Sequence, residues 1–168
     1  RIEPTKYTDD FEDEKEGESP SHWQENYVAD RVIDNWKVYK KESLVYGNQN
    51  KTGYTATWLH VFDNNPEFSA KFLVESAGDD AQVGFITRRS PDTAYVNIGY
   101  DYKSKKWFVA SQESEAAGEV IFWADSTSEL TTGEWHEIEV KENGSQVSVS
   151  GDGKTVIEAE NVKRTGYG

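Results

Sequence analysis

Three consecutive stretches in the middle of the chain carry the residues best suited to hold a sugar. They cover residues 82–88, 95–100 and 106–109, and short turn-rich gaps separate them. Sugar rings present apolar C–H faces rimmed by hydroxyls, so a site for them needs aromatic rings for stacking and fixed polar groups for orientation. The three stretches bring an arginine, an asparagine and several aromatic residues together. This composition predicts recognition rather than catalysis.

Side-chain parity divides these residues between two faces of a sheet. Neighbouring residues of a β-strand point to opposite faces, and Val83, Phe85 and Ile98 are suited to a core. The opposite surface then carries Arg88, Tyr95, Asn97 and Asp101. We expect the charged and amide groups to orient vicinal hydroxyls or a sugar carboxylate, and the tyrosine to stack. For Arg88, which stands beside Arg89, pairing with surface acids is the alternative.

The chain is rich in aromatic residues, with six Trp, nine Tyr and seven Phe. Trp107 and Trp135 lie in alternating strands beside apolar neighbours, so we expect both in the core. The other candidates for an exposed ring are Trp36, Trp58 and Trp123. Trp58 shares its face with His60, and the residues that alternate with them are apolar. We therefore place Trp36, Trp58 and His60 in the candidate site, with a structural hydrogen bond as the alternative role of the histidine.

The acidic opening of the chain suggests a calcium site. Asp10 and Glu12 share parity on a strand predicted over residues 7–12, and Ca²⁺ accepts carboxylate oxygens in flexible geometry. The spacing is not that of an EF-hand, and solvation alone also explains such acids. We expect Asp10 and Glu12 to bind a structural calcium ion, with a solvated surface as the alternative. Turn preference explains Asp152 in its Gly-Asp-Gly run.

A catalytic site is the competing interpretation. Glycoside hydrolysis uses two carboxylates about 5 to 9 Å apart, and Glu137 and Glu139 share one face of a strand. We expect that strand to be a solvent-exposed edge, which disfavours catalysis. A lyase would use His60 or Tyr95 as a base near Arg88. The chain has no nucleophile elbow, and its three histidines lack zinc-ligand spacing.

Length and charge set further bounds. At 168 residues the chain can bury a sizeable core, and we expect a single domain over residues 1–168. With 31 Asp and Glu against 18 Lys and Arg, its formal net charge of -13 disfavours nucleic acid, acidic membranes and polyphosphates as partners. No apolar run is long enough to span a membrane. The absence of cysteine excludes disulfides and thiolate chemistry.

Most of the chain shows the period-two alternation of β-strands and almost no helical periodicity. Two hairpins are predicted, one turning at Asn143-Gly144 and one at Gly151-Asp152-Gly153. Further strands are predicted at residues 7–12, 36–40, 44–46, 54–62, 68–74 and 120–124, with a short helix around 23–28 as an option. About twelve strands at this spacing predict an all-β, two-sheet antiparallel β-sandwich.

The chain also resembles a known group of proteins. Residues 9–13, followed by a glycine, a proline and Trp23, are similar to the opening of laminin-G-like or concanavalin-like jelly rolls in bacterial polysaccharide-processing proteins. Residues 84–88, followed by two tyrosines and Trp107, resemble strands of their carbohydrate-binding modules, including the family 66 group. Residues 133–140 resemble their closing hairpins. The resemblance implies a jelly-roll sandwich appended to a glycoside hydrolase or polysaccharide lyase.

These features predict a non-catalytic carbohydrate-binding module. We expect a monomer that binds a polysaccharide or oligosaccharide, targets a catalytic domain in the same chain, and neither binds nucleic acid nor inserts into a membrane. The chain starts at Arg1 and contains no Met, from which we expect a domain cut from a larger protein, secreted or on the cell surface. Two alternatives stay open: a catalytic glycoside hydrolase or polysaccharide lyase domain of sandwich type, and a laminin-G-type adhesion domain that contacts protein.

Overall fold

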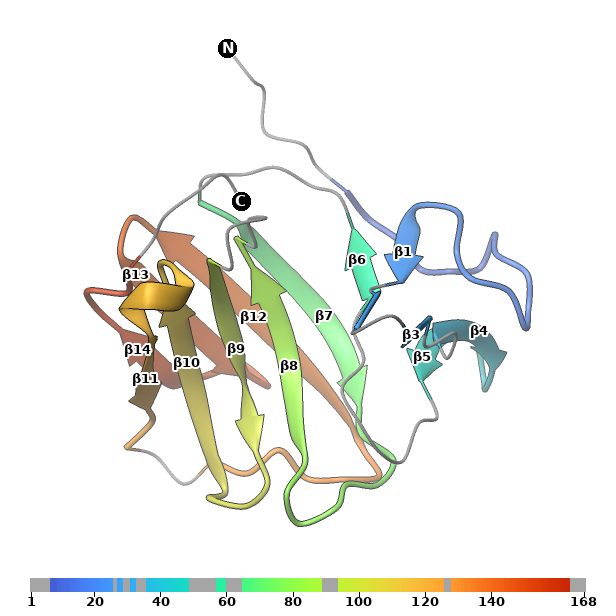
Figure 1. Ribbon diagram of the computed structural model, residues 1–168. Helices are drawn as coiled ribbons and strands as arrows, with labels where there is room; N and C mark the ends of the chain where they lie inside the picture. Colours follow the sequence, from blue (N-terminus) through green and yellow to red (C-terminus); the bar gives the residue numbers. More distant parts are fainter. Residues whose placement is uncertain are drawn as a thin grey trace. The chain divides into compact units, whose positions relative to one another are not determined.

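A computed structural model of the chain describes residues 7–25, 27–28, 31–32, 36–48, 57–59, 65–88, 94–125 and 128–163. It divides into two compact units, Arg1–Phe62 and Asp63–Gly168 (Figure 1). The expectation of a single domain over the whole chain stays a prediction.

The first unit contains short antiparallel strand pairs. They are β1 (Trp23–Glu25) with β6 (Thr57–Leu59), β2 (Tyr27–Val28) with β3 (Arg31–Val32), and β4 (Trp36–Lys40) with β5 (Leu44–Asn48). The ring of Tyr46 lies 5.3 Å from that of Trp23, and 5.5 Å from those of Phe11 and Trp36. This aromatic cluster supplies packing that short strand pairs need, because an isolated pair is only marginally stable.

The second unit is a sandwich of two four-stranded antiparallel sheets (Figure 1). The meander sheet consists of β8 (Gln82–Thr87), β9 (Tyr95–Asp101), β10 (Lys106–Gln112) and β11 (Glu119–Trp123), in the order β11-β10-β9-β8. The closing sheet consists of β7 (Glu67–Leu73), β12 (Trp135–Asn143), β13 (Gln146–Gly151) and β14 (Lys154–Ala159), in the order β14-β13-β12-β7. The predicted all-β, two-sheet antiparallel class is confirmed.

The core of the second unit lies between these sheets. Its fully buried members include Ile98, Val109, Ile138, Val140 and Val149. Burying each such side chain stabilises the fold by about 1.5–3 kcal/mol. The ring of Phe85 on β8 lies 5.2 Å from that of Phe68 and 5.8 Å from that of Phe72 on β7, so aromatic packing also joins the two sheets.

Both predicted hairpins are confirmed. Gly144 between β12 and β13 has a φ of 59°, while Asp152 and Gly153 between β13 and β14 have φ values of 51° and 78°. Glycine and aspartate tolerate the positive φ angles that such tight turns require. These turns bring β12, β13 and β14 together as consecutive neighbours.

Two local predictions are wrong. Residues 7–12 do not form a strand, because the carboxylates of Asp9 and Asp10 accept hydrogen bonds from the N–H groups of Phe11 (2.8 Å) and Glu12 (3.1 Å). Such bonds stabilise turns. Residues 23–25 form β1 rather than a helix. In the part of the chain that the structure describes, the helical element is the 3-10 turn η1 (Glu115–Ala117), and no helix is long and apolar enough to cross a membrane.

Candidate binding surface

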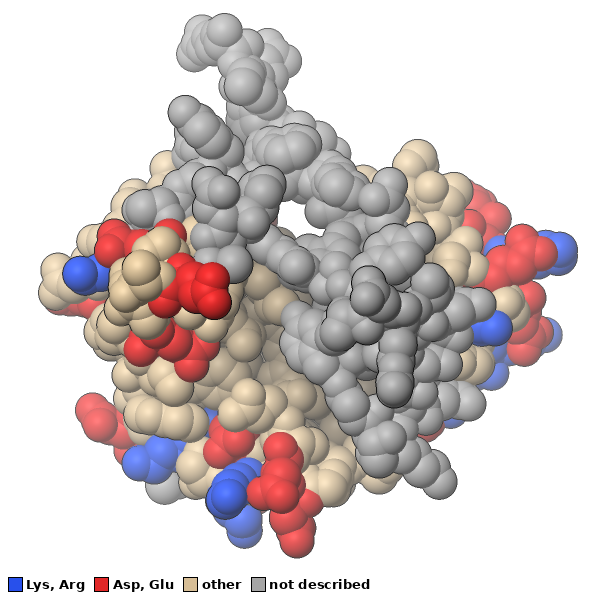
Figure 2. Space-filling model, viewed as in Figure 1, with Lys and Arg blue, Asp and Glu red and all other residues tan. Residues whose placement is uncertain are grey.

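The outer face of the meander sheet is the surface on which the sequence predicted a site. Strand register arranges its side chains in rows. Gly84, Gly99, Phe108 and Trp123 form one middle row, and Ile86, Asn97, Ala110 and Ile121 form the next. The charged residues of these strands occur in the end rows, which contain Asp101 and Lys106 at one end and Glu119 at the other. In the part of this view that Figure 2 shows in colour, the centre is tan and charged side chains lie at the left and lower margins.

A pair of glycines opens space in the first middle row. A Cβ on Gly84 would lie 2.0 Å from the carbonyl oxygen of Ile98, and a Cβ on Gly99 would lie 2.4 Å from that of Val83. No larger residue fits such a close backbone approach. The ring of Phe108 covers Gly99, with ring carbons 3.1 and 3.2 Å from the position of that Cβ. Gly99 therefore makes room for the ring of Phe108.

Trp123 is the exposed aromatic ring of this face. Its ring centroid lies 5.7 Å from that of Phe108, with the planes tilted by 57°. Trp123 is 43% exposed, whereas Phe108 is 4% exposed. A half-exposed indole held against a buried ring can stack on the apolar face of a sugar.

Tyr95 and Asn97 lie on the face that parity predicted. Both are half-buried and alternate with the buried Val96 and Ile98. The hydroxyl of Tyr95 donates a hydrogen bond to the carboxylate of Glu119 on β11. The fold thus places a tyrosine, an amide and Trp123 on one surface, while their part in binding stays a prediction.

Asp101 shares this parity, but its carboxylate is buried in a turn. It accepts hydrogen bonds from the side-chain amide of Gln82 at 3.0 Å and from the backbone N–H of Ser104 at 2.7 Å. Burial alone would raise the pKa of Asp101, but the hydrogen bonds from Ser104 and Gln82 outweigh burial and lower the pKa. Asp101 lies on the face that parity predicted, but its oxygens close the turn between β9 and β10, and its part in binding stays a prediction.

Arg88 turns into the sandwich instead of away from it. The residue follows the end of β8 with a φ of 55°, and its Nε donates to Oε1 of Glu142 at 3.2 Å. The two side chains are 5% and 1% exposed. Burial raises the pKa of Glu142, and the nearby guanidinium only partly offsets that rise. The predicted outward position of Arg88 is wrong, because a left-handed residue ends the alternation on which parity depends.

The first unit holds the other predicted site residues. Trp36 is half-buried in the aromatic cluster around Tyr46. Trp58 lies on β6, but its side chain is outside the described part of the structure, as is the whole of His60. The expected exposure of the pair stays a prediction.

Trp107 and Trp135 are the two tryptophans that we expected in the core. Trp107 is in the core as predicted, and its Nε1 donates to the carbonyl oxygen of Ser128 at 2.9 Å. Trp135 is 51% exposed on the outer face of the closing sheet, so its expected burial is wrong. It alternates out of phase with the buried Ile138 and Val140, which define the inner face of β12.

The carboxylates of the two predicted calcium ligands accept hydrogen bonds from backbone N–H groups. Asp10 accepts from the N–H of Glu12, and Glu12 accepts from the N–H of Leu44, each at 3.1 Å. Among the described residues, no group of three or more His, Asp or Glu side chains is arranged to hold a metal ion. Calcium binding at Asp10 and Glu12 stays a prediction.

Glu137 and Glu139 are exposed on the outer face of the closing sheet. Register places Glu137 opposite Lys71. Because β12 lies between β7 and β13, the predicted edge position of this strand is wrong; Ile138 and Val140, which alternate with the two glutamates, are buried. The carboxylate pair therefore lies on the opposite side of the core from Trp123.

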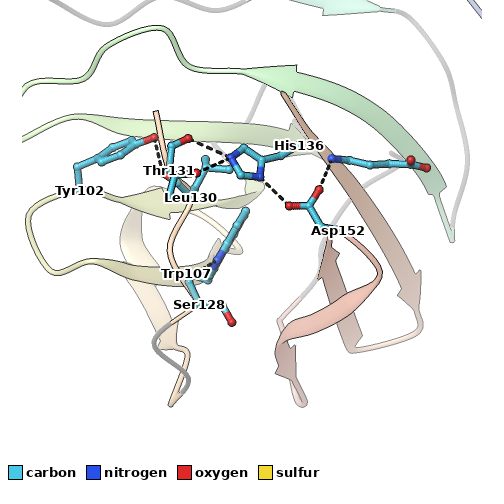
Figure 3. A network of polar contacts seen from close by, with 8 residues as sticks. Tyr102, Trp107, Ser128, Leu130, Thr131, His136 and Asp152 are labelled. Carbon is cyan, nitrogen blue, oxygen red and sulfur yellow. Dashed lines mark hydrogen bonds and ion pairs between the residues drawn. The ribbon is translucent and has the colours of Figure 1, made fainter. Parts of the chain in front are cut away.

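Sequence reasoning missed a polar network around His136 (Figure 3). Its Nδ1 lies 2.7 Å from a carboxylate oxygen of Asp152, and its Nε2 lies 3.0 Å from the carbonyl oxygen of Thr131. Burial lowers the pKa of His136, but the hydrogen bonds to Asp152 and Thr131 outweigh burial and raise it. Because both ring nitrogens face acceptors, the site favours the imidazolium form. The sequence did contain a signal for this network. His136 lies on the same face of its strand as Ile138, so it is expected to be buried, and a buried imidazole needs hydrogen-bond partners.

The same network fixes residues 128–131. Trp107 donates to the carbonyl of Ser128, and the hydroxyl of Tyr102 donates to that of Leu130 at 3.0 Å (Figure 3). Burial raises the pKa of Tyr102 to about 12, so this hydroxyl stays a donor at neutral pH. Three side chains thus hold the connection that leads from the meander sheet into β12.

Comparison with known proteins returned no relative of this chain. No protein-family model, no curated protein and no solved structure matches it. The case for a function therefore rests on the residues themselves.

Proposed function

We propose that this chain is a non-catalytic glycan-binding module that holds a neutral polysaccharide or oligosaccharide on the outer face of the meander sheet. The observation that carries the proposal is the half-exposed indole of Trp123, held against the buried ring of Phe108. The middle rows of this face carry no charged residue, and their exposed side chains include Trp123 and Ile121, which suits a neutral ligand. The burial of Arg88 removes the cation that would have favoured a carboxylated sugar.

The proposed roles follow from the spacing of the sheet. Trp123 stacks on the apolar face of one sugar ring, and the amide of Asn97 bonds to hydroxyls. These residues stand two strands and one row apart, which is about 10 Å across the strands and about 7 Å along them. They would therefore contact neighbouring units of an oligosaccharide rather than the same ring.

A binding role without turnover also agrees with the position of the two glutamates considered for hydrolysis. Glu137 and Glu139 face solvent from the closing sheet, whereas the stacking ring is on the meander sheet. A sugar bound at Trp123 would not reach them.

Affinity electrophoresis in gels that contain neutral polysaccharides tests this proposal, with released sugar measured in parallel. Losing a stacked indole costs about 1.5–3 kcal/mol, or roughly a ten- to hundredfold weaker Kd. We expect retention of the native protein, loss of retention in Trp123→Ala, and no released sugar. Trp135→Ala is the matched control, because it removes a similarly exposed indole from the other sheet.

Either of two results would reject the proposal. The first is a Trp123→Ala variant that is retained as strongly as the native protein on a polysaccharide to which the native protein binds. This result would show that Trp123 does not stack on the sugar. Sugar release that disappears in Glu137→Gln or Glu139→Gln would identify a hydrolase instead.

A further inference from the structure

Strand β11 is a sheet edge with exposed apolar residues. It is the terminal strand of the meander sheet, and among the described residues it pairs only with β10. The large hydrophobic side chains exposed in the described part of the chain are Val120 (43%), Ile121 (42%), Trp123 (43%) and Trp135 (51%). Three of these four belong to β11.

The backbone of this strand presents hydrogen-bonding groups on its open side. The N–H of Ala124 donates to the carbonyl of Trp107 at 2.9 Å, which identifies this residue pair as hydrogen-bonded. In an antiparallel ladder such pairs alternate with pairs whose N–H and C=O point away from each other. Phe122 and Val120 therefore bond to β10. The residues whose N–H and C=O point outward are Glu119, Ile121 and Trp123.

The two edges of the closing sheet differ from β11. Exposed charged residues stand on β7, at Glu67 and Lys71, and on β14, at Lys154 and Glu158. Charges on an edge strand discourage pairing with another chain. Strand β11 has no charged residue between Glu119 and the end of the strand at Trp123.

The surroundings of β11 are acidic. Glu119 begins the strand, Asp125 follows it, and Glu115 lies on η1 just before it, all with exposed side chains. Figure 2 shows acidic side chains gathered on the margin beside η1. A second copy of the chain would itself carry a formal net charge of -13. Charge complementarity therefore favours a basic partner over self-association.

We propose that the edge of β11 binds an extended, basic segment of a partner protein as an added antiparallel strand of the meander sheet. The outward N–H and C=O groups of Ile121 and Trp123 supply the main-chain bonds, as in other cases of strand addition. The partner places apolar residues opposite Trp123 and Ile121 and a Lys or Arg opposite Glu119. Its segment reads apolar-x-apolar-x-basic from N to C. Trp123 contributes to both proposed surfaces, whereas the outward main-chain groups of β11 take part only in strand addition.

Amide hydrogen exchange followed by NMR tests the open edge in the native protein. Free protein should exchange the amides of Ile121 and Trp123 quickly, while β10 protects those of Val120 and Phe122. The probe acetyl-Thr-Val-Thr-Val-Thr-Lys-Thr-amide should slow the first two amides by about tenfold or more. It should leave the other two unchanged. Changing the lysine of the probe to glutamate should weaken binding about tenfold.

Ile121→Pro provides the decisive variant. Proline removes the central outward N–H without removing a bond to β10, and edge positions of this kind tolerate it. Peptide binding should be lost in Ile121→Pro and kept in Ile121→Thr, the matched control that retains both the N–H and the β-branch. Asn97→Ala should weaken retention on polysaccharide and leave peptide binding unchanged, because Asn97 lies two strands away from the open edge; this difference separates the proposal from the glycan site.

Four results would overturn the proposal. Amides of Ile121 and Trp123 that are protected in free monomeric protein would mean that the edge is already covered. Equal binding of the lysine and glutamate probes would show that the edge does not select a basic segment. Equal binding of the lysine probe by Ile121→Pro and Ile121→Thr would show that no strand is added at this edge. Protection that increases with protein concentration in the absence of peptide would assign the edge to a second copy of the chain.

Discussion

Two ionisable side chains of β12 face the interior of the sandwich, His136 near one end of the strand and Glu142 near the other. Each meets a partner from another element, namely Asp152 in the turn between β13 and β14, and Arg88 at the end of β8. Arg88 and Glu142 are both buried, so removing Arg88 leaves a buried carboxyl group without its charged partner, which is strongly destabilising. These pairs therefore hold the ends of elements against β12.

The buried pair of Arg88 and Glu142 gives the first prediction. Arg88→Ala should lower the free energy of unfolding by about 3–5 kcal/mol, whereas replacing both partners by apolar residues, as in Arg88→Met with Glu142→Leu, should recover most of the loss. Urea denaturation measures both. Lys141→Ala, which breaks an exposed ion pair with Glu67, is the control and should change stability by about 1 kcal/mol or less. Unchanged stability in Arg88→Ala would instead indicate an arginine that faces solvent.

His136 gives a prediction about pH. Its pKa in the folded protein is raised above the ordinary value of 6.5. The stability that its protonated form contributes is therefore complete below about pH 6.5 and is lost as pH rises through the raised pKa. The pKa of Asp152 is lowered, so its contribution is lost instead as pH falls through that lowered pKa, below the ordinary 3.8.

Urea midpoints measured from about pH 6 to pH 9 test the histidine. The native protein should lose stability across this range, and His136→Gln should show a flatter profile. A native profile that rises through the same range would contradict a stabilising imidazolium.

At the scale of the elements, the close backbone contact between β8 and β9 explains why residues 84 and 99 are glycines. Gly84→Ala or Gly99→Ala should prevent native folding, because each new methyl group would meet a backbone carbonyl. Gly78→Ala is the matched control, since no atom lies within 4 Å of its added Cβ. Far-UV circular dichroism and thermal melting compare them. Native-like melting of both Gly84→Ala and Gly99→Ala would disprove the close approach.

Alternation predicted the elements of the second unit well, because burial on one face imposes a period of two on every strand. Tyr95, Asn97 and Trp107 consequently lie on the faces expected of them. Parity failed where the backbone leaves the strand, as at Arg88 with its positive φ. For Trp135 on β12, parity did not show whether the side chain faces the core or solvent, because an aromatic ring suits either face. Pairing between distant residues, such as His136 with Asp152, depends on topology that spacing does not contain.

At the scale of the molecule, the residues of the core cluster all belong to the second unit. Residues 63–168 should therefore fold without the first unit and unfold in one cooperative transition, since two packed sheets with one core form a complete domain. Urea denaturation followed by tryptophan fluorescence and far-UV circular dichroism should give coincident curves. A fragment that shows no cooperative transition would mean that the first unit is needed for folding.

The central claim is that a neutral glycan stacks on Trp123. The indole N–H signals in ¹⁵N-edited NMR spectra report on all six tryptophans separately. Titration with an oligosaccharide of a polysaccharide that retains the protein should shift the Trp123 signal in a saturable way and leave that of the similarly exposed Trp135 unchanged. Saturable binding that leaves Trp123 unshifted, or that shifts Trp135 instead, would contradict the account.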